Sequence, residues 1–465
     1  VYQLDRPLDL DRPITISADP GATLVFSQRP ADTPWTAAIK IRSGHVALDG
    51  FAVRFAGPIR WRDGISYGPA VIGARDNFDP NPPRPLADLS FTKLDLEAPA
   101  ASGRATWEPA VSLIRLANAV CGKVENCTLR GGPIEFFGGP WRIVGTTYNG
   151  TPAGTSSPGV IAGHYVHDLL VRGNTVRSVA PAGKTWRFLV LTGAGFNVLV
   201  DSNKVAGVGP RDDDTIPSAN APEIMRTEAY GLHFEGKPAA ISNEGRVLQI
   251  AEPQGDPART GAVVAVLAGP KAGTWHRVAQ AIDATTYLVD PPLPADTPAV
   301  SIATGFVFTT IRDNTIEAKG GSKAVGLVLV GNQFAARVQG NRFTGMGTAF
   351  QIAASATERP VHWGWSHSSG FDLAIEQNTV EDSRQGGLIL VEHGPPVKTS
   401  RGRTYLAGVF RGNTASPAGF TIGAAGATDP AELMLTADGA TLRVLAATIN
   451  GRAVRNESIS PPTAR

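Results

Sequence analysis

A short pattern of apolar and polar positions, hydrophobic-x-x-Asn-x-hydrophobic, recurs along most of the chain. Asn tolerates the left-handed backbone of a tight turn, and its amide can bond to an identical amide on a neighbouring strand about 4.8 Å away. The pattern therefore predicts a ladder of stacked corners, and hence a coil of strands. The predicted corner residues are Asn126, Asn174, Asn203, Asn314, Asn341, Asn378 and Asn413.

A short strand pattern follows each predicted corner. Its apolar residues lie two apart, which points them inward and leaves the residues between them outward. The aligned inward pairs are Ile134/Phe136, Leu189/Leu191, Leu232/Phe234, Leu327/Leu329, Phe350/Ile352, Leu388/Leu390 and Phe420/Ile422. The repetition of both signals favours a coil over the unrelated strands of a sandwich.

These repeats resemble those of the right-handed parallel β-helix superfamily, the pectate-lyase-like fold of many polysaccharide lyases, glycoside hydrolases and sugar epimerases. The resemblance covers roughly residues 40–425 and concerns the architecture alone. It implies an all-β protein, a right-handed parallel β-helix of about ten coils. It also implies that the chain acts on glycans, without indicating which chemistry it performs.

The long connections between the repeats predict how the chain is divided. Residues 237–304 contain short β-type runs separated by Gly, Pro and Asp, which indicates a small inserted β domain. We expect the coil to occupy residues 1–236 and 305–425, and residues 426–465 to form a cap and tail.

Composition agrees with this fold and bears on which classes of partner the chain could bind. The chain has 52 Gly, 36 Pro and 18% charged residues, which is typical of a turn-rich β protein. The formal charge is 43 − 41 = +2, so nothing indicates a nucleic-acid or membrane partner. No apolar run reaches the roughly 18 residues of a membrane span, and no signal peptide is seen. The first residues already show a strand pattern, so we expect a mature or trimmed chain. From the resembled families we expect it to be secreted or periplasmic, and the sequence leaves its oligomeric state open.

Ionisable residues on the predicted outward face indicate the candidate catalytic site. The aligned strands place Glu135, His233 and Glu235 outward, and the acidic segment 211–228 leads into the third strand. Glycoside hydrolysis needs two carboxyl groups, about 5–5.5 Å apart for retention or about 6.5–9.5 Å apart for inversion. We expect an acid/base pair drawn from Asp213, Asp214 and Glu235, with His233 and Arg187 near the scissile sugar. The function favoured is hydrolysis of a polysaccharide or oligosaccharide.

The acidic run itself has other interpretations. The Asp212-Asp213-Asp214 run is similar to the adjacent Asp pair of polygalacturonases, but their Gly-His-Gly and Arg-x-Lys steps are absent from the sequence. Clustered carboxylates also favour Ca²⁺, and they can cap a turn. Hydrolysis by two carboxyl groups requires no cofactor, and the sequence contains no His or Cys motif with the spacing of zinc ligands.

Two alternatives to hydrolysis stay open. A polysaccharide lyase needs a base and a cation beside a uronate carboxylate, and Lys184, Arg187, Arg226, Tyr230 and His233 lie in the right region. A noncatalytic glycan-binding or scaffold protein would use the same loops only to bind. Exposed indoles are good platforms for sugar rings, and polar residues near the rim can hold hydroxyls. The substrate-binding candidates are Glu135, Arg226, Tyr230, Trp363, Trp365, Glu392 and His393.

Overall fold

The computed structural model describes residues 1–29, 31–62, 69–74, 86–99, 111–117, 119–149, 159–177, 187–208, 223–229, 231–255, 257–259, 261–361, 364–368, 370–383, 387–392, 405–417, 420–425, 432–438, 442–444, 448–449 and 452–453. These residues form strands, turns and loops, and none of them lies in a helix. The described part of the chain accordingly contains no helix able to cross a membrane.

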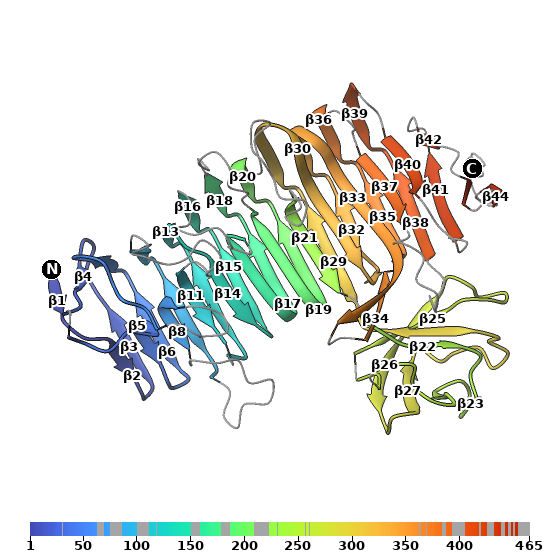
Figure 1. Ribbon diagram of the computed structural model, residues 1–465, viewed down its shortest axis with the longest axis horizontal. Coiled ribbons are helices and arrows are strands. Elements are labelled where there is room, and N and C mark those ends of the chain that lie inside the picture. The colour runs from blue at the N-terminus through green and yellow to red at the C-terminus, as the bar shows by residue number, and fades with distance from the viewer. Residues whose placement is uncertain are drawn as a thin grey trace.

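The strands stack as successive turns of one coil, with the N-terminal strands at one end and the C-terminal strands at the other (Figure 1). Each turn contributes one strand to each of three parallel sheets. Sheet 1 contains β2 Leu8–Leu10, β5 Ala37–Ile41, β8 Ala70–Ala74, β11 Ser112–Leu116, β14 Ile134–Phe137, the first part of β17 Ile161–Arg172, the first part of β19 Leu189–Asp201, β21 Glu223–Ala229, the last part of β30 Thr315–Gly331, β33 Arg342–Val361, β37 Gly387–Glu392, β40 Phe420–Ala425 and β42 Leu442–Val444.

The other two sheets complete each turn. Sheet 2 contains β3 Ile14–Ser17, β6 Val46–Asp49, β9 Leu89–Thr92, β12 Gly122–Glu125, β15 Trp141–Val144, the last parts of β17 and β19, β29 Phe306–Arg312, β31 Gln333–Phe334, β32 Arg337–Gln339, β35 Gly370–Glu376, β38 Tyr405–Arg411 and β41 Glu432–Asp438. Sheet 3 contains β1 Tyr2–Leu4, β4 Thr23–Phe26, β7 Ala52–Phe55, β10 Asp95–Glu97, β13 Thr128–Arg130, β16 Thr147–Asn149, β18 Thr175–Arg177, β20 Lys204–Val208, the first parts of β30 and β33, β36 Thr379–Ser383 and β39 Thr414–Pro417.

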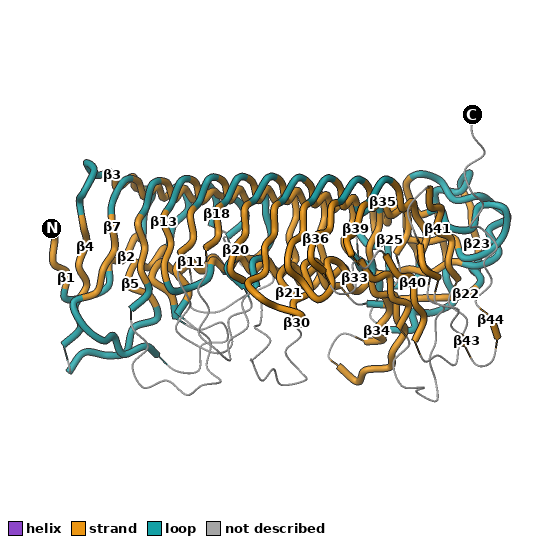
Figure 2. The backbone as a smooth tube through the Cα atoms, turned by 90° about the horizontal axis from the view of Figure 1, so that it is seen from above, coloured by secondary structure: helices purple, strands orange, loops and turns teal. Residues whose placement is uncertain are grey.

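The predicted fold, a right-handed parallel β-helix, is confirmed. Seen along a perpendicular direction, the turns form one regular tube (Figure 2). Inward side chains such as Phe91, Phe136, Leu191 and Phe343 are fully buried in one continuous apolar core. The strands β41 and β42 extend sheets 2 and 1 beyond residue 425, so part of the segment expected to be a cap continues the coil.

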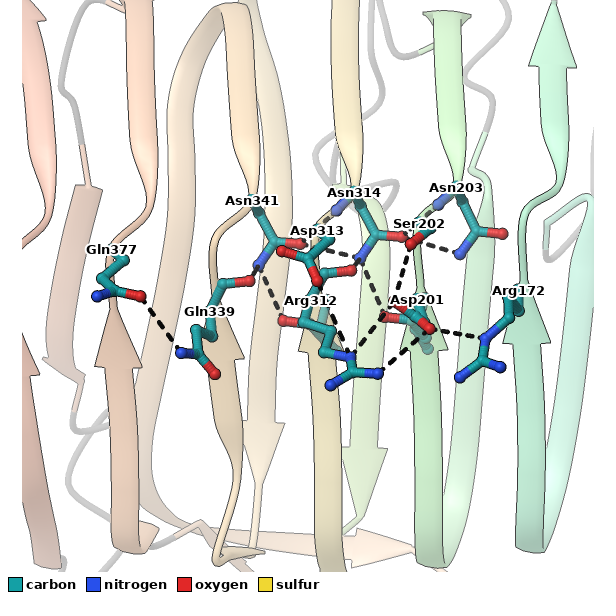
Figure 3. Close-up of polar contacts among 12 residues, drawn as sticks. Arg172, Asp201, Ser202, Asn203, Arg312, Asp313, Asn314, Gln339, Asn341 and Gln377 are labelled. Atoms are coloured by element: carbon teal, nitrogen blue, oxygen red, sulfur yellow. Dashed lines mark hydrogen bonds and ion pairs between the residues drawn. The ribbon is translucent and has the colours of Figure 1, made fainter.

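The corner between sheets 2 and 3 carries the Asn ladder. Each Asn side-chain amide donates to the next Asn Oδ1, at 2.9 Å from Asn174 to Asn203 and 2.8 Å from Asn203 to Asn314, and the series continues to Asn413. Figure 3 shows its central part. Every backbone N–H of these residues before Asn413 also donates to the next Asn Oδ1, at 3.0–3.1 Å. Identical amides at one corner therefore bond turn to turn.

The prediction that Asn126 belongs to this ladder is wrong. The pairing of Thr128 with Thr147, and of Thr147 with Thr175, puts Cys127 and Thr146 at the corner position. Asn126 lies one residue earlier, with a left-handed φ of 54°. Burial raises the pKa of the Cys127 thiol to about 12, so this corner is neutral. The turn formed by β15 and β16 was not expected, because no Asn marks its corner.

Replacing Asn341 by alanine should destabilise the coil. Its buried amide donates to Asn378 Oδ1 at 2.9 Å and to the Ile311 carbonyl at 2.8 Å, and its Oδ1 accepts from the Asn314 backbone at 3.1 Å. Each lost bond costs about 1 kcal/mol, with more where a buried group loses its partner. We expect a clear fall in the Tm measured by circular dichroism.

The matched control is Gln339→Ala, two residues earlier on the same turn. Gln339 is exposed, and its side chain donates to Gln377 Oε1 at 3.3 Å (Figure 3). Exposed hydrogen bonds contribute little, so its Tm should stay near that of the parent. Equal Tm values for the two variants would contradict a structural role of the buried ladder.

An antiparallel sheet projects from the coil between β21 and β29 (Figure 1). It contains β22 Leu232–Gly236, β23 Ala240–Ser242, β24 Val247–Gln249, β25 Val263–Val266, β26 Trp275–Ala281, β27 Thr286–Asp290 and β28 Val300–Ala303. The sheet has a core of its own, including Leu248, Val264, Val278 and Tyr287. Its pairing begins at Leu232, five residues before the predicted start at 237. The division into domains stays a prediction.

The expectation that Leu232 and Phe234 continue the coil is wrong. β21 occupies that place instead, with Met225 opposite both Leu189 and Leu327. The apolar alternation of β21 is interrupted because Thr227 takes the next inward position, where it is 1% exposed and donates to Gln333 Oε1 at 3.3 Å. The polar inward Thr227 breaks the apolar alternation of β21, so the sequence pattern did not identify that strand. The more regular alternation of β22 was assigned to the coil in its place.

Candidate functional site

Two rows of outward side chains cross sheet 1, one residue from each strand. Coil spacing puts neighbours in a row about 4.8 Å apart. Row A contains Arg115, Glu135, Ala162, Val190, Arg226 and Val328. Row B lies two residues further along each strand and contains Phe137, His164, Thr192, Glu228 and Val330. The ionisable members of the two rows, together with the neighbouring Arg187 and Glu223, form the candidate site.

A carboxylate and an imidazole form the first part of the site. Glu135 Oε1 lies 3.7 Å from His164 Nε2, within ion-pair range, and Ser112 Oγ donates to Glu135 Oε2 at 3.3 Å. His164 Nδ1 lies 2.7 Å from Thr192 Oγ1, and the Phe137 ring stacks on the imidazole with centroids 4.6 Å apart. The imidazole is therefore fixed on three sides.

This arrangement favours one tautomer of His164. A carboxylate beside Nε2 favours a proton on that nitrogen. Nδ1 then carries the lone pair, which accepts a hydrogen bond from the rotatable Thr192 hydroxyl. The His164 side chain is 21% exposed, so a ligand can reach the ring from solvent. The pair has the geometry of an oriented general base.

The backbone changes direction directly after His164. Tyr165 has a left-handed φ of 52° and is 40% exposed, and the register of β17 against β19 shifts between His164 and Val166. A Cβ on Gly193 would lie 2.8 Å from the Tyr165 ring, so the ring packs closely over this glycine. A bulged residue with positive φ is strained, and such residues are concentrated at functional sites.

Four charged residues form the second part of the site. Glu223 bonds Arg187 at 3.1 Å and Arg226 at 3.1 Å, and Arg226 also bonds Glu228 at 2.6 Å. The Glu223 side chain is 7% exposed, against 20% for each arginine and 25% for Glu228. Burial lowers the pKa of Arg187, while the Glu223 carboxylate opposes that shift. Glu223 therefore holds two arginines together at the strand.

Short apolar side chains separate the two parts. Ala162 and Val190 occupy row A on the strands between Glu135 and Arg226, and both are buried. By coil spacing, Arg226 lies two strands, or about 10 Å, beyond the strand of His164, and Arg115 lies two strands before it. Guanidinium groups therefore stand on both sides of the imidazole along the coil.

The structure places three residues expected from the sequence on this face, in two separate groups. Glu135 lies beside His164, and Arg187 and Arg226 share Glu223. Their roles in catalysis and substrate binding stay predictions.

The expected outward placement of His233 and Glu235 on the coil is wrong. Both lie on β22 of the antiparallel sheet, because β21 fills the coil position. His233 is 9% exposed, with Nε2 2.6 Å from Thr304 Oγ1. The backbone N–H of Glu235 donates to Gln254 Oε1 at 3.1 Å. These two residues therefore do not belong to either row of sheet 1.

The remaining expected residues cannot be placed in the site. Trp365 lies on β34 Gly364–Ser368, opposite Leu232, and Glu392 ends β37 opposite Ala425, with their backbones alone described. Asp213, Asp214, Tyr230, Trp363 and His393 lie outside the described residues, as do Asp212 and Lys184.

His164, Glu223 and Glu228 were not expected on this face. The strand of His164 was missed because Gly163 takes its inward position, so no apolar pair marks it. A Cβ on Gly163 would lie 2.9 Å from both the Phe136 and Leu191 side chains, so the core excludes a larger residue there. The two histidines of the GHYVHD segment are visible in the sequence as candidate functional residues. The sequence pattern alone did not align them with the strands of the coil.

Metal binding receives no support from the described ranges, where no three or more His, Cys, Asp or Glu side chains are grouped closely enough to hold an ion. The Ca²⁺ interpretation concerns the acidic run at Asp212, which lies outside those ranges. It stays a prediction.

Comparisons with known proteins concern the fold. No family model matches the chain, and no curated protein matches it. Solved structures of mutants of the periplasmic alginate epimerase AlgG are similar. A single-substitution mutant has 9% identity and a TM-score of 0.43, covering 93% of this chain and 77% of that one. A double mutant has 9% identity and a TM-score of 0.39, with the same coverage of both chains. Another single mutant has 9% identity and a TM-score of 0.35, covering 93% of this chain and 76% of that one.

Proposed function

We propose that sheet 1 binds a uronate-containing polysaccharide and that His164 removes a proton from the sugar carbon bonded to the carboxylate. The electron pair of the broken C–H bond forms a C=C double bond as the C–O bond to the leaving sugar breaks. The leaving oxygen takes up a proton from water. The reaction is the β-elimination of a polysaccharide lyase, expected from the sequence as the alternative to hydrolysis.

The observation that carries this proposal is a carboxylate-oriented imidazole between arginines. Glu135 favours a proton on Nε2 of His164, so Nδ1 is the basic nitrogen, and it takes up the substrate proton when the Thr192 hydroxyl turns away from it. Removal of a proton beside a carboxylate builds negative charge on that group, and a guanidinium stabilises it. Arg226, which is 20% exposed, lies two strands away on one side, and the buried Arg115 lies two strands away on the other.

Hydrolysis receives less support from the described face. A glycoside hydrolase needs a protonated carboxyl group opposite a second carboxylate. On sheet 1, Glu223 and Glu228 are paired with Arg226, and Glu135 faces His164. Hydrolysis by Asp213 and Asp214 stays a prediction, as does a purely binding role. A polysaccharide substrate fits the expected secreted or periplasmic location.

A panel of polyuronates and neutral polysaccharides tests the proposal. We expect ultraviolet absorbance from unsaturated uronate ends with one or more polyuronates, and no product from neutral glycans. New reducing ends without that absorbance would indicate hydrolysis instead. Exchange of deuterium from solvent into the carbon beside the carboxylate, without chain cleavage, would indicate that the proton is removed and replaced from solvent with no elimination, which would contradict the lyase reaction. The absence of any product and any exchange would leave a binding protein and overturn the proposal.

A further inference from the structure

A cavity opens on the same face of sheet 1, on the N-terminal side of the Glu135–His164 pair. Its volume is about 320 Å³, and its lining includes Thr36, Lys40, Arg42, Gly73 and Arg115. Lys40, Gly73 and Arg115 are register partners on β5, β8 and β11, so they extend row A toward the N-terminus. The cavity is therefore aligned with the proposed catalytic centre.

Gly73 explains why space exists there. The outward positions on either side of it carry long cationic side chains, about 10 Å apart by coil spacing. Gly73 adds no side chain between them, and a Cβ at this position would lie only 2.9 Å from the Ala37 Cβ. The middle strand thus forms a floor, with Lys40 and Arg115 on opposite sides.

Cationic side chains line the cavity. Among its described lining residues, Lys40, Arg42 and Arg115 are cations and none is a carboxylate. The nearest members of the row on either side are acidic, but both carboxylates have other partners. Asp9 accepts from Arg42 Nε at 3.2 Å, and Glu135 bonds Ser112 and faces His164. Arg115 is 1% exposed, so its guanidinium is held in place by the surrounding protein.

From this geometry we infer that the cavity binds an anionic substituent of the glycan, in the first place a second uronate carboxylate of the same chain. The inference rests on the proposed function, since it makes the cavity a subsite of that substrate. From Gly73 to the strand of His164 there are three strand spacings, or about 14 Å. A glycan must be long enough to span this distance before the cavity contributes to its affinity.

Binding to Lys40→Gln tests the inference. Affinity is measured by titration calorimetry in a His164→Gln background, so that no turnover interferes. We expect a long uronate oligosaccharide to bind about tenfold more weakly when Lys40 is replaced, the scale of one charged contact. A uronate disaccharide bound at the catalytic centre should be unaffected, because it cannot reach the cavity. Retained circular dichroism and Tm show that the variant is folded.

The matched control is Lys123→Gln in the same background. Lys123 lies on β12 of sheet 2, is 42% exposed and pairs with Glu125 at 3.4 Å. Its loss should leave both affinities unchanged. A fall in affinity as large as that of Lys40→Gln would show a general charge effect and overturn the subsite.

The outcomes separate this inference from the proposed function. Lys40-dependent binding of long uronates, without any turnover by the parent protein, supports the cavity and contradicts the lyase. If the parent protein turns over long uronates but their affinity does not depend on Lys40, the lyase is supported and the subsite is contradicted. A sulfated oligosaccharide of equal length that binds as tightly as the uronate supports an anion site and overturns its preference for carboxylate.

Discussion

Replacing His164 by glutamine is expected to lower turnover of a uronate glycan by at least about a hundredfold, the usual scale for loss of a general base. Glutamine can still donate to Glu135 and accept from Thr192, whose contacts hold the imidazole at 3.7 Å and 2.7 Å. It has no basic nitrogen, so it keeps the local packing and loses the chemistry. The rate constant should fall, while the Tm stays within a few degrees of the parent.

His167→Gln is the control for this variant. His167 lies three residues later on the same strand, is 48% exposed and pairs with Asp168 at 3.2 Å. It faces away from rows A and B, since β17 passes from sheet 1 to sheet 2 between the two histidines. Its turnover should equal that of the parent. Activity of His164→Gln close to the parent level would rule out the imidazole as the base.

Much of the fold was predictable from the sequence because its stabilising contacts repeat. A buried amide that bonds to its own copy on the next turn requires Asn at that position, as Asn203, Asn314 and Asn341 show. The prediction failed where another residue takes the corner. Thr146 offers only its backbone N–H, which donates to Asn174 Oδ1 at 3.0 Å, and this suffices to begin the ladder. A residue that acts through its backbone leaves no signal in the sequence.

The site was less predictable because it is defined by neighbours in space. Val190 and Arg226 are register partners, although Arg226 belongs to the acidic segment 211–228, which looked like the approach to the next strand. Pairing the two residues required a strand to be recognised within that segment, and the inward Thr227 concealed it. The inward Gly163 concealed the strand of His164 in the same way. Exceptions to apolar alternation thus lie on the two strands that carry most of the site.

The ion pairs of Glu223 are expected to stabilise the coil. A carboxylate that is 7% exposed lies between two guanidinium groups, and each is only 20% exposed. Removing the Glu223 carboxylate takes away part of the charge compensation of both arginines, although Glu228 still bonds Arg226, and loss of one partner of a buried pair costs about 3–5 kcal/mol. The pair thereby holds Arg187 and Arg226 at the edge of row A, where a substrate carboxylate could approach them.

Glu223→Gln is therefore expected to destabilise the protein by about 3 kcal/mol, because the neutral amide can retain hydrogen bonds but removes the most buried negative charge beside the two arginines. The control is Glu228→Gln, which removes a carboxylate bonded to the same Arg226 at 2.6 Å but 25% exposed. Water replaces an exposed partner readily, so its cost should be below about 1 kcal/mol. Urea unfolding followed by tryptophan fluorescence compares the two midpoints at equal protein concentration. If Glu223→Gln unfolds at the same urea concentration as Glu228→Gln, the buried carboxylate does not organise the arginines, and the positioning of Arg226 must come from the strand alone.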